Sequence, residues 1–264
     1  MRVLFVGDIV GKPGRQIASA QIPGLQREYE IILTIANAEN AAGGIGITPS
    51  VAEELFRVGI DLLTSGNHVW DKKEAELYIA AERRLLRPAN YPEEAPGSGV
   101  AIWEHGGRRV GVLNLQGRVF MPTIDCPFKV GEQKIALLKQ ATDLIIVDFH
   151  AEATSEKQAF ARFVDGRVSA VIGTHTHVQT ADEQILPAGT AYISDVGMTG
   201  ASDSVIGVDA SDVIRRFLTQ MPSKFRVAKG TPILSAVVLD LEEETGRARA
   251  ITRLQLRENG GGVW

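Results

Sequence analysis

The amino-acid sequence predicts an α/β protein in which two mixed β-sheets pack together between layers of helices. In the first part of the chain, a short apolar run, a polar loop and a helix-like stretch follow one another three times. This alternation is typical of parallel strands with helices on their faces. Near the end, two long strand-like runs at 232–241 and 247–256 have the pattern of a hairpin. The combination favours two sheets over one.

The first three helices carry recognisable start signals. Pro13 suits a first helical turn, Thr48-Pro49 supplies an N-cap and a first helical residue, and Asp71 is expected to cap the third helix. The strands are expected at 2–7, 31–36 and 60–63, and the helices at 13–28, 49–58 and 71–84.

The middle of the chain changes to an antiparallel pattern and then returns to parallel units. A turn at His105-Gly106-Gly107 joins the strand-like runs 99–103 and 109–115, as in a hairpin. The later elements are helices expected at 131–140, 154–164 and 211–218, and strands expected at 144–149, 168–172, 185–186 and 191–193.

Composition limits the class of protein. A chain of 264 residues with 44% hydrophobic and 23% charged residues is typical of a globular protein, and we expect a single domain over residues 1–264. The net charge of −4 predicts no duplex nucleic acid partner. A lone cysteine, Cys126, excludes an internal disulfide, and neither a signal peptide nor a membrane span is evident. We therefore expect a cytoplasmic protein without a membrane partner, while the oligomeric state, a homo-oligomer included, stays open.

Polar residues with metal-binding side chains follow most of the predicted parallel strands. Groups outside the carboxyl ends of such strands gather at one edge of the sheet. On an extended strand end, His175 and His177 would point the same way, as suits metal binding. Eight such groups exceed what one ion needs, which favours a two-metal site bridged by Glu39. The eight residues are Asp8, Glu39, Asn40, Asn67, His68, His150, His175 and His177.

Each residue alone also has an ordinary structural explanation. Asp8 could cap a turn, and His150 could be a buried histidine with a satisfied ring. A P-loop is excluded, because three residues separate Gly7 from Gly11 and Pro13 stands where Ser or Thr must bind magnesium. The metal-site hypothesis therefore depends on the order in which all the signals occur.

That order resembles the calcineurin-like metallophosphoesterases. Their motifs correspond here to Gly7-Asp8, Glu39, Gly66-Asn67-His68, His150 and His175-Thr176-His177. The sequence departs from the usual pattern at Val10, at Asn37-Ala38-Glu39-Asn40 and at Val69. This combination is similar to the YmdB-like branch of bacterial cyclic-nucleotide phosphodiesterases. The resemblance implies a four-layer αββα sandwich.

The resemblance also implies roles for the site residues. One metal ion would be held by Asp8, Glu39, Asn40 and His177. The other would be held by Glu39, Asn67, His150 and His175. His68 would then be free to act as the general acid, with Asp71 a candidate to orient it. Iron or manganese is expected, and nitrogen and oxygen ligands also admit zinc.

The implied reaction is hydrolysis of a phosphodiester, expected to be a 2′,3′- or 3′,5′-cyclic nucleotide, by a hydroxide that bridges two metal ions. The motif segments hold no arginine, which favours a diester over a more highly charged monoester. Two alternatives stay open. One is a regulatory or RNA-associated metal-binding protein with feeble turnover, and the other is a phosphomonoesterase or phosphoprotein phosphatase.

Overall fold

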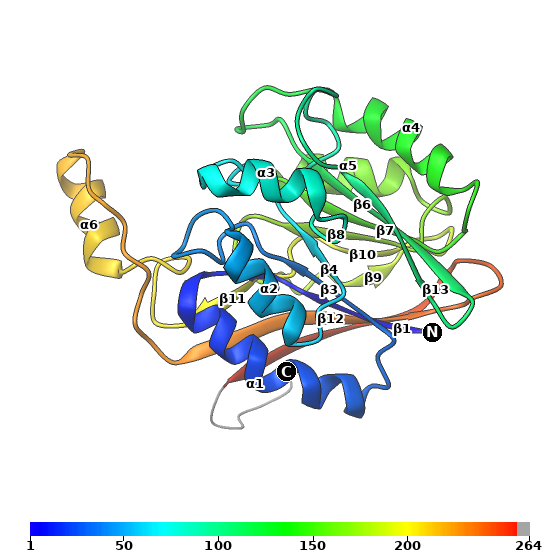
Figure 1. Ribbon diagram of the computed structural model, residues 1–264, viewed down its shortest axis with the longest axis horizontal. Coiled ribbons are helices and arrows are strands. Elements are labelled where there is room, and N and C mark those ends of the chain that lie inside the picture. Colours follow the sequence, from blue (N-terminus) through cyan, green and yellow to red (C-terminus); the bar gives the residue numbers. More distant parts are fainter. Residues whose placement is uncertain (258–264) are drawn as a thin grey trace.

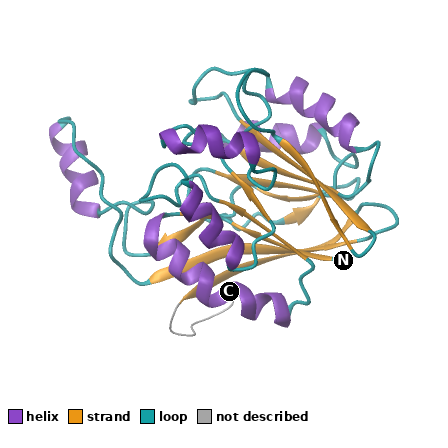
Figure 2. Ribbon diagram, in the orientation of Figure 1, coloured by secondary structure: helices purple, strands orange, loops and turns teal. Residues whose placement is uncertain are grey.

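The computed structural model describes residues 1–257 and has the predicted arrangement of helices, sheet, sheet and helices (Figure 1). Within these residues the strands form two mixed sheets, drawn in orange in Figure 2, with helices on both outer faces. None of the helices in this range combines the length and apolar character that crossing a membrane requires.

The first sheet is built around the N-terminal strand β1 (Arg2–Val6). β1 pairs in parallel with β3 (Leu33–Asn37) on one side and antiparallel with β12 (Pro232–Leu241) on the other. The predicted long hairpin is confirmed, since β13 (Ala248–Arg257) pairs antiparallel with β12. Across the sheet the order is β2 (Asp8–Ile9), β11 (Met198–Ala201), β12, β1, β3 and β4 (Leu62–Thr64).

The second sheet begins with the predicted hairpin and continues with parallel strands. Gly106 (φ 57°) and Gly107 (φ 80°) are both left-handed, as a tight two-residue hairpin turn requires. Across this sheet the order is β5 (Val100–His105), β6 (Arg108–Gln116), β7 (Ile145–His150), β8 (Ala170–Thr174), β10 (Ala191–Ile193) and β9 (Gln184–Ile185).

Helices cover the outer face of each sheet. Against the first sheet pack α1 (Gly11–Glu28), α2 (Pro49–Arg57) and α3 (Lys73–Ala81). Against the second sheet pack α4 (Pro127–Leu138) and α5 (Thr154–Phe163). The remaining helix, α6 (Ala210–Thr219), stands away from the body at the left of Figure 1.

The alternation of side chains along β1 explains why the sheets pack as they do. Leu4 and Val6 face the helices α1 and α2, whereas Val3 and Phe5 face the second sheet. Both faces of the strand are therefore apolar and fully buried, as expected for a central strand covered on both sides. The contact between the sheets fixes the distance between their carboxyl ends, where the candidate site lies.

Several expected boundaries differ from the structure by two residues or more, among them those of α3, α4 and β8. α3 begins at Lys73 and ends at Ala81, and its N-cap, Lys72, makes no side-chain capping bond. The prediction that Asp71 caps this helix is wrong, because its carboxylate accepts a hydrogen bond from the His68 ring instead. α4 begins earlier than expected, at Pro127, which suits a first helical turn. β8 continues to Thr174, two residues beyond the expected end.

Candidate active site

The eight predicted residues lie at the carboxyl edge of the two sheets. Asp8 is in β2, Glu39 and Asn40 follow β3, and Asn67 and His68 follow β4, so the first sheet supplies these groups. The second sheet supplies His150 at the end of β7, and His175 and His177 after β8. The edge position is what parallel strands predict.

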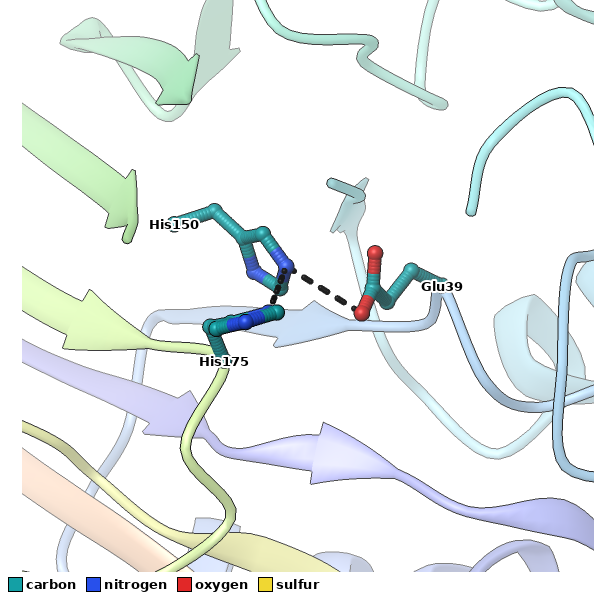
Figure 3. A group of neighbouring side chains, drawn as sticks. All are labelled: Glu39, His150 and His175. Carbon is teal, nitrogen blue, oxygen red and sulfur yellow. Dashed lines mark hydrogen bonds and ion pairs between the residues drawn. The ribbon is translucent and has the colours of Figure 1, made fainter. Parts of the chain in front are cut away.

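Glu39, His150 and His175 form the first candidate ligand group, with ligand atoms within 4.8 Å of one another (Figure 3). His150 Nε2 lies 3.1 Å from Glu39 Oε1 and 3.0 Å from His175 Nδ1. The same nitrogen lies 3.2 Å from the amide oxygen of Asn67. Two imidazole nitrogens, a carboxylate and an amide oxygen thus converge, a donor set that suits iron, manganese or zinc.

Asp8, Glu39 and His177 form the second group. Asp8 Oδ1 lies 4.0 Å from His177 Nε2 and 3.8 Å from His150 Nδ1. The amide nitrogen of Asn40 lies 3.1 Å from both Glu39 Oε1 and His177 Nε2. A ligand role for Asn40 therefore needs its amide turned over, so that the oxygen faces the site.

A contact on the first sheet's side of the site involves His68. Its Nδ1 lies 2.6 Å from Asp71 Oδ2, and the two side chains are 34% and 42% exposed. The backbone N–H of His68 donates to Glu39 Oε2 at 3.2 Å. His68 is thus tied to the candidate metal ligands through its backbone, while its ring lies outside both ligand groups.

The backbone around the histidine pair is not an extended strand end as expected. β8 stops at Thr174, and both His175 (φ 98°) and His177 (φ 66°) are left-handed. Their side chains therefore do not follow strand alternation, and they face different neighbours. His175 joins Glu39 and His150, whereas His177 joins Asp8 and Glu39.

Gly66 is required for the approach of β4 to the site. A Cβ atom at this position would overlap the ring of His150 and the Oε2 oxygen of Glu39, well inside 3.0 Å. A larger residue would displace two candidate ligands together. The glycine of the Gly66-Asn67-His68 segment thus has a steric role beside the ligands.

Burial and close charges shift the pKa values of these groups strongly. Burial raises the pKa of Asp8 to about 7, although His177 and His150 act in the opposite direction. Burial disfavours the charged forms of Glu39 and His150, but the attraction between their opposite charges, together with their hydrogen bond and other nearby groups, outweighs this effect on both pKa values. The pKa of Glu39 falls to about 2 and that of His150 rises to about 9. Burial and the charge of His150 lower the pKa of His175 to about 3.

These residues fit a bound cation. Among residues 1–257, Asp8 Oδ1 is a buried oxygen without a hydrogen-bond partner, although both neighbouring rings offer nitrogens nearby. A buried carboxylate oxygen is normally paired, and leaving it unpaired costs stability. The facing nitrogens of His150 and His175, 3.0 Å apart, also share at most one proton between them. A divalent ion held by each group would satisfy these atoms.

Comparison with known proteins identifies the family. The sequence profile of the family described as YmdB-like protein matches residues 4–254. The chain belongs to the YmdB-like family. A relative that matches nearly the whole chain is named as a phosphodiesterase, and the chain is a hydrolytic enzyme.

Three relatives cover nearly the whole chain. A 2′,3′-cyclic-nucleotide 2′-phosphodiesterase from Bacillus subtilis is 48% identical over 259 residues, which is 98% of this chain and 98% of the relative. The crystal structure of a hypothetical protein from Thermus thermophilus is 42% identical with a TM-score of 0.91, covering 98% of this chain and 100% of that one. The crystal structure of a phosphatase from Mycoplasma pneumoniae is 36% identical with a TM-score of 0.90, covering 97% and 93%.

The YmdB-like site also contains residues that the sequence did not single out. Buried Asp148 accepts hydrogen bonds from Thr174 (2.7 Å) and Asn37 (3.0 Å), and Thr174 Oγ1 lies 2.9 Å from His150 Nδ1. Glu152 lies 3.1 Å from His175 Nε2. A charged residue inside the apolar run Ile145–His150 was the signal for Asp148. No local pattern marks Glu152, because its partner follows a different strand.

Proposed function

We propose that this YmdB-like protein is a phosphodiesterase that hydrolyses a cyclic nucleotide at a centre of two divalent metal ions, manganese or iron. The observation that carries the proposal is the position of Glu39, whose carboxylate belongs to both candidate ligand groups. A shared carboxylate is the usual bridge in two-metal sites. The name of the relative from Bacillus subtilis supports a 2′,3′-cyclic nucleotide as the substrate.

Hydrogen bonds on the far side of each ring favour a defined ligand nitrogen. His177 Nδ1 donates to the carbonyl oxygen of Ile206 (2.8 Å), which leaves Nε2 for a metal ion. His150 uses Nδ1 toward Thr174, which likewise leaves Nε2. His175 is the reverse case, since Glu152 faces its Nε2 and Nδ1 faces the site. The resulting ligand sets are Asp8, Glu39, Asn40 and His177 for one ion, and Glu39, Asn67, His150 and His175 for the other.

When bound, the two ions supply Lewis acidity at the phosphoryl oxygens and a nucleophile from water at neutral pH. The protein's own charge suits such a substrate. Asp8 and Glu39 offset only part of the charge of two divalent ions, which leaves about two positive charges at the site. A singly charged phosphodiester is attracted by this balance.

In this proposal His68 donates a proton to the departing ribose oxygen. Its Nδ1–H donates to the Asp71 carboxylate at 2.6 Å, which fixes the ring and leaves Nε2 free to face the substrate. This is the arrangement of a general acid oriented by a carboxylate. It also accounts for Asp71, which makes this contact instead of capping α3.

Turnover and metal content together test the proposal. With added Mn²⁺, the protein should hydrolyse 2′,3′- or 3′,5′-cyclic nucleotides, and bis-nitrophenyl phosphate faster than nitrophenyl phosphate. His68→Ala should reduce turnover by roughly 100-fold or more while metal content stays nearly complete. Glu39→Ala should remove both ions.

Three outcomes would contradict this proposal. Preference for the monoester would assign the protein to the phosphomonoesterases. Equal loss of metal and activity in His68→Ala would make His68 a ligand. A full metal complement in Glu39→Ala would exclude the bridge. A regulatory protein with feeble turnover is distinguished by steady-state rates on the cyclic nucleotides.

A further inference from the structure

The buried carboxylate of Asp195 is hydrogen-bonded to Thr176, the residue that separates the two histidines in the sequence. Asp195, which follows β10, accepts hydrogen bonds through Oδ2 from the backbone N–H (3.0 Å) and the hydroxyl (2.8 Å) of Thr176. The same oxygen lies 2.8 Å from the ammonium nitrogen of Lys157 on α5. Asp195 Oδ1 accepts from the backbone N–H of Gly197 at 2.8 Å. Three parts of the chain therefore meet at one carboxylate.

The burial of this ion pair calls for an explanation other than stability. Asp195 and Lys157 are each 1% exposed. Two charges buried to this extent lose most of their hydration, and their attraction commonly does no more than offset that loss. A buried ion pair of this kind has a clearer role where it holds neighbouring groups in one specific geometry. Here the fixed geometry is that of Thr176.

Thr176 stands between two strained residues. His175 and His177 both have positive φ angles, which residues other than glycine adopt rarely. Backbone of this kind persists only where the surroundings hold it. The bonds from Thr176 to Asp195 restrain the backbone between the two histidines, while Glu152 and Ile206 contact the rings themselves.

We propose that Asp195, held by Lys157, is a positioning residue that sets His175 and His177 through Thr176, and so sets the affinity of both metal ions. This inference rests on the proposed function, because it takes the two histidines as ligands of different ions. Neither Asp195 nor Lys157 belongs to the candidate ligand groups. Their effect on metal binding passes through the backbone.

Metal binding measured apart from activity tests the inference. Thr176→Val removes the hydroxyl with little change in shape, Thr176→Ser keeps it, and Asp195→Asn weakens every bond to the carboxylate. The Mn²⁺ concentrations for half-occupancy should rise roughly tenfold or more at both ions in Thr176→Val and Asp195→Asn. Thr176→Ser should keep the Mn²⁺ affinity within roughly threefold of the wild-type value. Thr245→Val, a remote threonine whose hydroxyl also bonds a carboxylate, is the matched control and should change nothing.

The same variants separate positioning from stability. Excess Mn²⁺ should return Thr176→Val to near wild-type turnover, as expected if the site is intact but loosely held. Asp195→Asn leaves Lys157 buried without its countercharge, so the double variant Lys157→Met, Asp195→Asn is measured beside it. Unchanged Mn²⁺ midpoints in Thr176→Val and the double variant overturn the inference, whatever happens to the unfolding temperature. Wild-type protein that binds Mn²⁺ but hydrolyses no diester overturns the proposed function, while shifted midpoints in the variants still support the positioning role.

Discussion

Replacing Gly66 by alanine tests how tightly the strand end packs against the proposed metal ligands. The added methyl group would lie well inside 3.0 Å of both the His150 ring and Glu39 Oε2, whereas ordinary van der Waals contact begins near 3.4 Å. Gly66 does not have a positive φ, so the backbone itself accepts alanine. The clash therefore acts directly on the two side chains.

The size of the effect follows from the overlap. Relieving it requires a shift of about 1 Å in His150, in Glu39 or in the Gly66 segment, and misplacement of that size at a reacting site costs roughly 100-fold in rate. Metal–ligand distances tolerate only about 0.2 Å. We expect kcat/KM to fall by roughly 100-fold, equivalent to about 2.7 kcal/mol of transition-state stabilisation, together with weaker Mn²⁺ binding.

The assay compares Gly66→Ala with Gly24→Ala. Gly24 lies in α1, and a Cβ atom there meets nothing within 4 Å. Gly24→Ala should keep full activity and gain roughly 0.5–1 kcal/mol of stability from helix propensity. Hydrolysis of bis-nitrophenyl phosphate and Mn²⁺ titration are measured for both variants. A Gly66→Ala protein with full metal content and kcat/KM within threefold of wild type would refute the reasoning.

Two further predictions concern the protonation of site residues, the first in catalysis and the second in metal binding. Asp71→Asn should lower kcat roughly tenfold to 100-fold without changing metal content, because His68 loses the carboxylate that orients it. Steady-state kinetics together with elemental analysis checks this prediction. A loss of metal that matches the loss of activity would contradict it. Metal binding should release protons and tighten as pH rises, because His150, with a pKa raised to about 9, and Asp8, with a pKa raised to about 7, must lose their protons to bind an ion. Calorimetric titration with Mn²⁺ in buffers of different ionisation enthalpy measures this release, and affinity that does not change between pH 6 and 9 would contradict it.

The fold could be predicted from the sequence because its signals are local. The apolar run at Val3–Val6 and the alternation of strand and helix depend on neighbouring residues. The hairpin turn at Gly106-Gly107 needs left-handed backbone that glycine adopts freely. Thr48 caps α2 as expected, accepting a hydrogen bond from the N–H of Val51 at 3.4 Å.

The parts of the site that could not be predicted depend on contacts between distant strands. Asp71 has the composition of a helix cap, and only the position of the His68 ring shows why it has another partner. The left-handed backbone of His175 and His177 could not be predicted locally, because residues other than glycine adopt it uncommonly, even histidine, which is enriched there. Asp195, which restrains the residue between them by accepting a hydrogen bond from the backbone N–H of Thr176, follows a different strand.

The proposed centre is divided between the two sheets, and this division explains why each ion needs both. The first sheet supplies the carboxylates and amides of Asp8, Glu39, Asn40 and Asn67, and the second supplies the imidazoles of His150, His175 and His177. Either sheet alone offers an incomplete ligand set for either ion. The packing of Val3 and Phe5 against the second sheet therefore holds together the two halves of the proposed ligand set.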